Sequence, residues 1–291
     1  MIIEAAACVA ESATGFEAAG AMNLPDDLSA MGYHGDKEKT VVVLGLARSG
    51  TSVVTAMLGA IGVEMGSSLY DKANPLGSFE DEDFAELHKQ VFEFTGTDKN
   101  YWNPPSTEEI LNLKEPWAPQ IQEIVAQKSK KAKIWGWKHP RTVLTIELFL
   151  PYLRNPHFVA VFRNPLGIAN SSVEHTKNYK LGRVDLLQAL KLTSFYYGEM
   201  FKVLERHPDV PTISVAFEEV VTQPIQEAKR LADFLEVELT EAGKAQIERL
   251  VISREEIAKE KKRAAGLLGG KIPRLFRKYT RSLRGKKSPR E

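Results

Sequence analysis

The sequence predicts an α/β fold with three layers, in which a parallel sheet is flanked by helices and carries a P-loop-like phosphate-binding turn. Three observations predict it. Apolar runs that suit buried strands alternate with longer segments of helical periodicity. The first run, residues 41–44, is uniformly apolar and rich in valine, as in a strand covered on both faces. A loop with two glycines and a helix opening near Thr51 follow it directly.

The composition describes a globular chain with one sizeable core. The 291 residues are 43% hydrophobic and 26% charged, which is enough for one α/β core. Cys8 is the only cysteine, so no intrachain disulfide can form. Apolar runs stay shorter than a membrane span, and Glu4 interrupts a start that has no preceding basic residue, unlike a signal peptide. We therefore expect a cytoplasmic protein.

Charge divides the chain into three parts. Residues 1–39 hold seven acidic and two basic residues without sustained periodicity, which predicts a mobile acidic extension. Residues 40–253 carry the alternating strands and helices of the predicted domain. Residues 254–291 form a basic tail with apolar residues at helical spacing. The tail is either solvated or an interfacial helix that contacts the inner face of a membrane or a polyanion; nucleic acid is not an expected partner.

The loop after the first strand resembles a Walker A sequence and departs from it at one position. Gly45 and Gly50 have the Walker A spacing and Ser52 fills the hydroxyl position, but Thr51 stands where the phosphate-binding lysine belongs. The cation is Arg48, inside the loop. This arrangement fits Mg-nucleotide hydrolysis poorly. It predicts a cradle for a phosphate that carries a second anionic group, and a tight turn that binds nothing is the alternative.

Basic residues stand at the carboxyl ends of two further predicted strands. Residues 133–137 lead to Lys138, and residues 157–162 lead to Arg163. Open α/β sheets bind ligands at this edge. Ser171 lies eight residues after Arg163, about two turns into the next helix, so both side chains can reach one phosphate. Arginine where a Walker B acid belongs favours an anion over a metal ion, and no metal site is expected.

Two stretches rich in large apolar residues indicate a function less specifically than the loop and the strand ends do. Trp102 and Trp117 belong to an irregular aromatic segment that either walls an acceptor pocket or packs against the sheet. Residues 184–206 predict an amphipathic helix, and we expect its large apolar side chains, including Leu187 and Phe201, to face the core.

The two phosphate-binding segments together resemble the sulfotransferase family that uses 3′-phosphoadenosine 5′-phosphosulfate (PAPS). LARSGTS resembles its 5′-phosphosulfate loop and FRNPLGIANSS its 3′-phosphate element. The resemblance covers roughly residues 40–237 and implies a PAPS-dependent sulfotransferase without a metal. It implies contacts to the 5′-phosphosulfate from Arg48, Ser49, Gly50, Thr51 and Ser52, and to the 3′-phosphate from Arg163 and Ser171.

The same resemblance implies catalytic roles. WKHPR resembles a KDPR-like segment whose lysine, here Lys138, approaches the transferring sulfuryl group, although His139 replaces the usual acid. Arg48 and Lys138 are the cations expected to stabilise developing charge. Glu80, in NPLGSFE, matches a carboxylate that serves as general base in relatives. Glu80 is therefore the first candidate for the base and Asp81 the second, and His88 and His139 are further candidates.

No pattern in the sequence identifies the acceptor. The aromatic residues near Trp102 and Trp117, with the basic tail, predict a sugar hydroxyl on a glycan or glycolipid, while a small alcohol or phenol stays open. Two other classes of protein are also considered. A P-loop nucleotide or small-molecule kinase is disfavoured by Thr51 and Arg163, and a non-catalytic module that keeps the nucleotide site stays open.

Overall fold

The computed structural model describes residues 38–66, 79–96, 102–113, 117–179 and 184–250. Within these ranges, four parallel strands form one sheet in the order β2-β1-β3-β4. The strands are β1 (Lys39–Leu44), β2 (Ile134–Lys138), β3 (Pro156–Phe162) and β4 (Thr212–Ala216). The predicted α/β fold, a parallel sheet between layers of helices, is confirmed.

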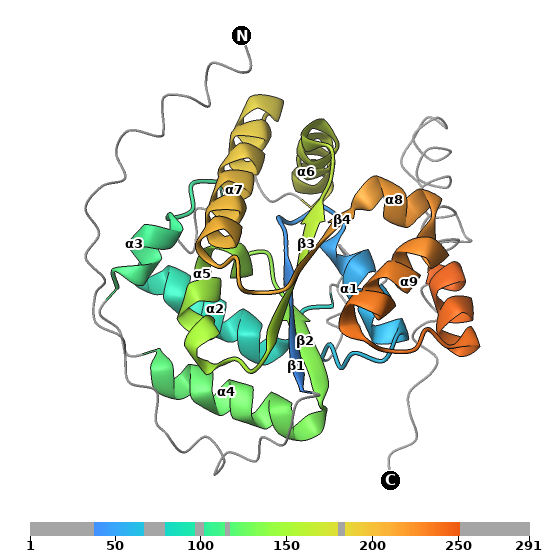
Figure 1. The fold of residues 1–291 in the computed structure, drawn as a ribbon. Helices are drawn as coiled ribbons and strands as arrows, with labels where there is room; N and C mark the ends of the chain where they lie inside the picture. Colours follow the sequence, from blue (N-terminus) through green and yellow to red (C-terminus); the bar gives the residue numbers. More distant parts are fainter. Residues whose placement is uncertain (1–37, 67–78, 97–101, 114–116, 180–183, 251–291) are drawn as a thin grey trace, which may run out of the picture. The chain divides into compact units, whose positions relative to one another are not determined.

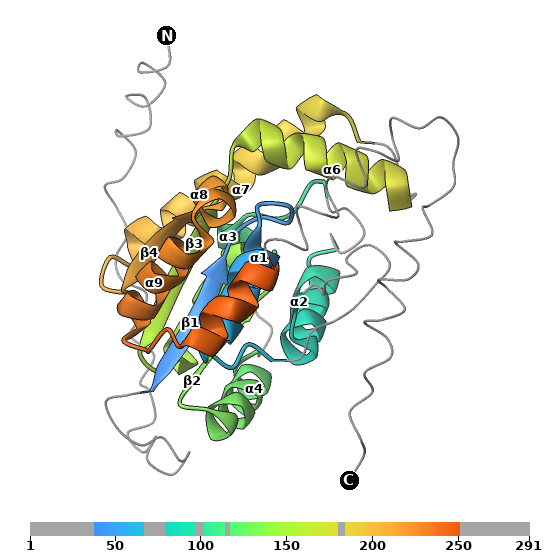
Figure 2. The ribbon, with the colours of Figure 1, turned by 90° about the vertical axis from the view of Figure 1, so that its right-hand side faces the viewer.

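Helices cover both faces of the sheet (Figure 1). One face carries α1 (Thr51–Ala60), α8 (Phe217–Thr222) and α9 (Pro224–Leu235), and the other carries α2 (Glu82–Phe94), α5 (Thr142–Phe149) and α7 (Leu186–Arg206). Figure 2 shows α6 (Pro165–Tyr179) lying beside α7. The other named elements are α3 (Thr107–Leu111), α4 (Ala118–Lys131) and the 3₁₀ turn η2 (Leu150–Tyr152); residues 241–250 are also helical.

Strand β1 lies at the centre of the core. Val41 and Val43 join α1 and α9 in one apolar cluster, and the alternating residues Val42 and Leu44, also fully buried, point to the opposite face. A strand that is covered on both faces must be apolar at every position. The uniform apolar run at 41–44 is therefore explained by the two helical layers.

An aromatic layer fills the second face. The Trp137 ring of β2 stacks on Phe84 of α2 at 4.3 Å between centroids, and Phe149 of α5 packs against both rings. All three side chains are buried, and burying one large aromatic side chain stabilises a fold by roughly 2 to 3 kcal/mol. This layer fixes α2 against β2, and so holds Glu80, just before α2, beside the end of β2.

The carboxyl ends of β1 and β3 form a topological switch point. The chain leaves β1 into α1 on one face, while it leaves β3 into α6, which packs on α7 of the other face. Two strands that diverge in this way leave a crevice between them, and ligands of open α/β sheets bind there. The glycine loop and Arg163 both border this crevice.

The structure corrects the predicted starts of the first strand and of helix α2. Lys39, placed in the extension from the sequence, belongs to β1 and is buried, with its ammonium donating to the Leu235 carbonyl. Helix α2 begins after Glu80, because Asp81 accepts the Asp83 N–H as the N-cap. The remaining acidic extension and the basic tail lie outside the described residues.

The interpretation of α7 was wrong for its large apolar residues at the surface. Leu187 is 62% exposed and Phe201 55% exposed. The large side chains of Tyr196 and Met200 are buried as expected, and the buried stripe follows helical spacing. Its members are Ala189, Leu192, Thr193, Tyr196, Met200 and Val203.

Candidate functional site

The loop between β1 and α1 has the geometry of an anion-binding turn. Gly50, the N-cap of α1, has φ +99°, and a Cβ there would lie 2.2 Å from the ring of Phe217. The first helical hydrogen bonds are donated by Val53 and Val54 to the Gly50 carbonyl. The amides before them belong to the open first turn, where backbone N–H groups and the helix dipole favour an anion.

Ser49 shapes this loop from inside. Its hydroxyl and its backbone N–H both donate to the Leu46 carbonyl, at 2.6 Å and 3.1 Å, and the residue is fully buried. Thr51 is also buried, whereas Ser52 is half-buried. Both donors of Ser49 are therefore engaged within the turn.

The structure brings the two predicted phosphate-binding segments into direct contact. The Arg163 guanidinium donates to the Arg48 carbonyl at 2.8 Å, and Arg48 Nε donates to Ser171 Oγ at 3.1 Å. Arg48 itself lies in the left-handed region with φ 72°, a conformation that costs energy for a residue with a side chain. Residues more than a hundred positions apart in sequence thus gather two guanidinium groups beside one glycine turn.

Two further residues contact Arg163, and a third binds its neighbour Asn164. The Tyr197 hydroxyl accepts the Arg163 N–H at 2.9 Å and donates to its carbonyl at 2.7 Å. The guanidinium carbon lies 4.3 Å from the centroid of the Phe217 ring, a cation–π contact. Glu218 accepts the N–H of Asn164. Phe217 and Glu218 both belong to FEEVVTQP, which resembles a late segment of the family domain, whereas no sequence pattern indicated Tyr197.

Arg163 is affected by burial and by charges of both signs. Burial lowers the pKa of Arg163 from its usual value, the charge of Arg48 lowers it further, and Glu218 acts in the opposite direction. Two guanidinium groups that destabilise each other are relieved by an anion placed between them. The arrangement suits a phosphate or sulfate group.

A second cluster lies at the end of β2. Lys138 is only 2% exposed, and its ammonium contacts Glu80 Oε1 at 2.7 Å. Because Lys138 pairs in register with Val43 of β1, this ion pair stands on the same sheet edge as the glycine loop. His139 follows, with Nε2 3.9 Å from Glu80 Oε2.

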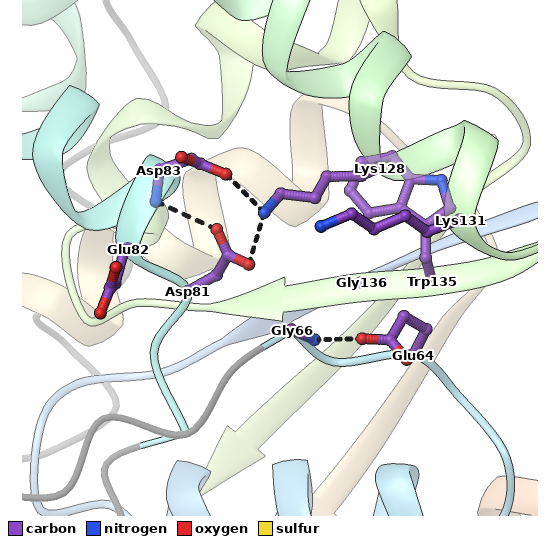
Figure 3. A pocket seen from close by; sticks show the side chains of 9 residues that line it. All are labelled: Glu64, Gly66, Asp81, Glu82, Asp83, Lys128, Lys131, Trp135 and Gly136. Atoms are coloured by element: carbon purple, nitrogen blue, oxygen red, sulfur yellow. Dashed lines mark hydrogen bonds and ion pairs between the residues drawn. The ribbon is translucent and has the colours of Figure 1, made fainter. Parts of the chain in front are cut away.

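The other acidic candidate has a structural task. Asp81 is buried, caps α2 through Oδ1, and contacts the Lys128 ammonium through Oδ2 at 2.6 Å. Figure 3 shows this pair, with Asp83 on the same ammonium, in a polar cavity of about 400 Å³ between α2, α4 and the edge of β2. Asp81 is thus oriented toward Lys128, whereas Glu80 is oriented toward Lys138.

His88 is a fully buried structural residue. Its Nδ1–H donates to the Phe84 carbonyl, and its Nε2 accepts from the Thr142 hydroxyl at 3.2 Å. The Thr142 oxygen in turn accepts from Trp137 Nε1 at 3.1 Å. Burial lowers the pKa of His88 to about 4, so its ring is neutral and both nitrogens are engaged.

The aromatic segment packs in the structure. Trp102 packs against a small apolar cluster of Ala169, Val184 and Ala189, and Trp117 meets Phe94 edge-on at 6.2 Å. Among the described residues, no group of three histidine, cysteine, aspartate or glutamate side chains is arranged to hold a metal ion. None of the helices in the described ranges is long and apolar enough to cross a membrane.

Fold and site together define a class: an α/β protein with a P-loop-like glycine turn and basic side chains gathered at the carboxyl edge of a parallel sheet. The family follows from comparison with known proteins. Residues 40–241, more than two thirds of the chain, match the sulfotransferase family, and the chain belongs to this family. The resemblance read from the sequence is confirmed, and the protein is a sulfotransferase of the PAPS-dependent kind.

Solved structures with a similar arrangement are distant in sequence. The sulfotransferase domain of the Synechococcus PCC 7002 olefin synthase has 14% identity and a TM-score of 0.48, with 72% of this chain and 77% of that chain covered. Sulfotransferase STF9 from Mycobacterium avium has 15% identity and a TM-score of 0.47, with 75% and 69% covered. The sulfotransferase domain of the curacin biosynthetic pathway has 17% identity and a TM-score of 0.45, with 71% and 76% covered. Comparison with curated proteins finds no match.

Proposed function

We propose that this sulfotransferase binds PAPS across the crevice between β1 and β3 and transfers its sulfuryl group to an acceptor hydroxyl at the end of β2. The contact between Arg163 and the Arg48 carbonyl, with Arg48 on Ser171, is the observation that carries the proposal. It joins two motifs that are far apart in the sequence.

The residues present fit a donor with phosphate groups at two ends. The first-turn amides of α1, with Gly50, Thr51 and Ser52, would hold the 5′-phosphosulfate, and Arg48 would add its charge. Arg163 and Ser171 would hold the 3′-phosphate. Because both Ser49 donors already bind Leu46, Ser49 would keep the loop in shape rather than donate to the ligand.

The chemistry then needs a base and a cation at the sulfur. The acceptor oxygen forms a bond to sulfur while the bond from sulfur to the bridging phosphate oxygen breaks, and that electron pair leaves with adenosine 3′,5′-bisphosphate. Glu80 would take the acceptor proton. Lys138 and Arg48 would stabilise charge on the sulfuryl and leaving oxygens. Glu80 contacts Lys138, the cation expected at the sulfuryl group, whereas Asp81 contacts Lys128 and both nitrogens of His88 bind within the core, which supports Glu80 as the base.

The acceptor is proposed as a hydroxyl of a glycan or glycolipid. Trp102 is partly exposed while packed against the cluster that includes Ala169 of α6, the helix that carries Ser171, and aromatic rings provide flat apolar surfaces that suit sugars. The basic tail would add contact with a membrane surface or a polyanionic acceptor. A cytoplasmic location, peripheral to the inner membrane face, stays part of this proposal.

A thermal-shift comparison tests the donor site. Adenosine 3′,5′-bisphosphate should raise the melting temperature progressively with concentration, because a ligand that binds only the native state stabilises it by RT ln(1 + [L]/Kd). ATP with Mg²⁺ and ADP should have much smaller effects, since neither carries a 3′-phosphate for Arg163. Equal stabilisation by ATP with Mg²⁺ would contradict the assignment of the site to PAPS and would favour the nucleotide or small-molecule kinase instead.

An acceptor screen with radiolabelled donor tests transfer itself. Label should move to a hydroxyl-bearing glycan or glycolipid and not to water alone. Selective binding of the bisphosphate without transfer to any acceptor class would favour the non-catalytic nucleotide-binding module. Transfer to small phenols alone would contradict the glycan proposal and leave the sulfotransferase assignment intact.

A further inference from the structure

His139, the residue after Lys138, differs from the residue type expected at this position and is held in place by its neighbours. His139 stands where related segments carry an acid, directly after β2. Its side chain is 14% exposed. The imidazole stacks on the ring of His88 with centroids 4.5 Å apart and an interplanar angle of 25°. The ring therefore has a fixed plane, held by a neighbour that is itself locked by hydrogen bonds.

The position of the His139 proton follows from its neighbours. The backbone N–H of Arg141 donates to His139 Nδ1 at 3.2 Å, so this nitrogen is an acceptor. The proton of the neutral ring consequently belongs on Nε2, the nitrogen that lies 3.9 Å from Glu80 Oε2. The assignment comes from the hydrogen-bond network. It places an N–H group 3.9 Å from Glu80 Oε2, while the Lys138 ammonium lies 2.7 Å from Oε1.

The surroundings also keep the ring uncharged. Burial lowers the pKa of His139 well below its usual value, and the charges of Lys138 and Arg141 lower it further. Glu80 is the acid that faces the ring. At neutral pH the group beside Glu80 is therefore a hydrogen-bond donor without a charge.

From this geometry we infer that His139 is a positioning residue for Glu80, which holds Oε2 through a neutral Nε2–H while Lys138 binds Oε1. The inference rests on the proposed role of Glu80 as base. When Lys138 turns to the sulfuryl oxygens, Oε1 becomes available for the acceptor proton, and His139 keeps the carboxylate in place. Catalytic hydrogen bonds that are long without substrate tighten when it binds.

The neutral donor has a physical advantage over either charged alternative. An acid at position 139 would place a second negative charge beside Glu80 and favour its protonated form. An imidazolium would add a second cation to the one that Lys138 supplies and compete with the acceptor for the carboxylate. A neutral N–H orients the carboxylate and leaves it able to accept a proton.

The kinetic test compares three variants with the acceptor found by the screen. His139→Phe keeps the stacking on His88 and removes the donor, so kcat should fall about tenfold with KM for the donor substrate unchanged within about twofold. His139→Gln restores a neutral donor and should recover most of kcat. His139→Asp should be at least as impaired as His139→Phe at neutral pH. Equal kcat in the Phe and Gln variants would overturn the inference.

A double-mutant cycle separates this role from general stability. In a Glu80→Gln background, His139→Phe should lower the residual rate no further, because a residue that acts through Glu80 has nothing left to position. A full additional tenfold loss in that background would assign His139 to another task. If the proposed function itself fails, the wild type makes no sulfated product and the bisphosphate gives no stabilisation, a different pattern.

A spectroscopic measurement needs no acceptor. Long-range ¹H–¹⁵N spectra of ¹⁵N-histidine protein report the tautomer and charge of each ring, and the His139→Gln variant identifies the signals of His139 among the six histidines. A neutral Nε2–H ring at pH 7 is expected. An imidazolium or an Nδ1–H tautomer at pH 7 would overturn the inference.

Discussion

The two halves of the proposed site differ in how their charges are balanced. Around the β1 loop and the end of β3, Arg48 and Arg163 lie close together, and each destabilises the charge of the other. At the end of β2, Lys138 is neutralised directly by Glu80 at 2.7 Å, next to two uncharged imidazoles. In the first half two guanidinium groups lie close together, whereas in the second a cation and a carboxylate are already in direct contact before any ligand arrives.

This difference separates binding from chemistry. Two neighbouring guanidinium groups contribute to the affinity for a doubly phosphorylated donor, because binding removes repulsion between them. An internally paired base and cation contribute little to ground-state affinity and can exchange partners during transfer. Changes in the first half should thus alter Kd, and changes in the second should alter kcat.

The largest effect is expected at the base. Glu80→Gln should lower kcat by roughly 10²- to 10⁴-fold, since the amide cannot accept the acceptor proton. The Kd for adenosine 3′,5′-bisphosphate should stay within about twofold, by calorimetry. Glu82→Gln, two residues away and exposed on α2, is the matched control and should keep wild-type kcat. Equal turnover of the Glu80 variant would remove Glu80 from the role.

The buried imidazoles of the second half should make the free energy of unfolding depend on pH. The pKa of His88 is lowered to about 4 by burial, whereas an unfolded histidine titrates near 6.5. Between these values the unfolded state binds more protons, so stability is complete above pH 6.5 and falls as the pH drops. The loss between pH 7.5 and pH 4 should be about 3 kcal/mol from this group.

Urea unfolding at a series of pH values measures this loss. His88→Gln has no titrating ring and should show a shallower decrease of the unfolding free energy over the same range, despite a lower stability at pH 7.5. An identical pH dependence in the variant and the wild type would place the decrease elsewhere. In that case the lowered pKa of His139 or the ion pairs of Glu147 would be the next groups to test.

In the first half, Arg163→Ala should raise the Kd for adenosine 3′,5′-bisphosphate by roughly 10- to 100-fold, the loss of a charge-assisted hydrogen bond. Calorimetry measures it. Arg163→Lys keeps the charge but not the contact geometry and should have an intermediate effect. Arg230→Ala, which removes an exposed arginine paired with Glu227, is the control. An unchanged Kd in the Arg163 variants would refute the 3′-phosphate assignment.

The structure around the glycine loop was predictable from the sequence because it depends on neighbouring residues. The strand at 41–44, the turn at Gly50 and the helix from Thr51 lie in one continuous segment, and each follows from the residue types of that segment. Arg163 and Lys138 were likewise placed at strand ends by the apolar runs before them. Fold and principal cations were therefore predictable from local patterns.

Contacts between residues that are far apart in the sequence were not predictable in the same way. Tyr197 contacts Arg163 from 34 positions away, and Lys128 contacts Asp81 from 47 positions away. No local pattern marks such pairs, because they arise only when α7 packs by β3 and α4 packs by α2. The tautomer of His139 similarly depends on the turn that brings the Arg141 N–H onto its ring.

The smallest effect is expected at Phe217, the ring between Gly50 and Arg163. Phe217→Leu keeps an apolar side chain beside the glycine turn and removes the cation–π contact, so the Kd for adenosine 3′,5′-bisphosphate should rise about two- to tenfold. Phe234→Leu, at the opposite end of the sheet against His157, is the matched control and should leave Kd unchanged. Combined with Arg163→Ala, Phe217→Leu should add almost nothing, because the ring acts on binding through the guanidinium. Full additivity would instead mean that Phe217 contacts the nucleotide or holds the loop independently of Arg163.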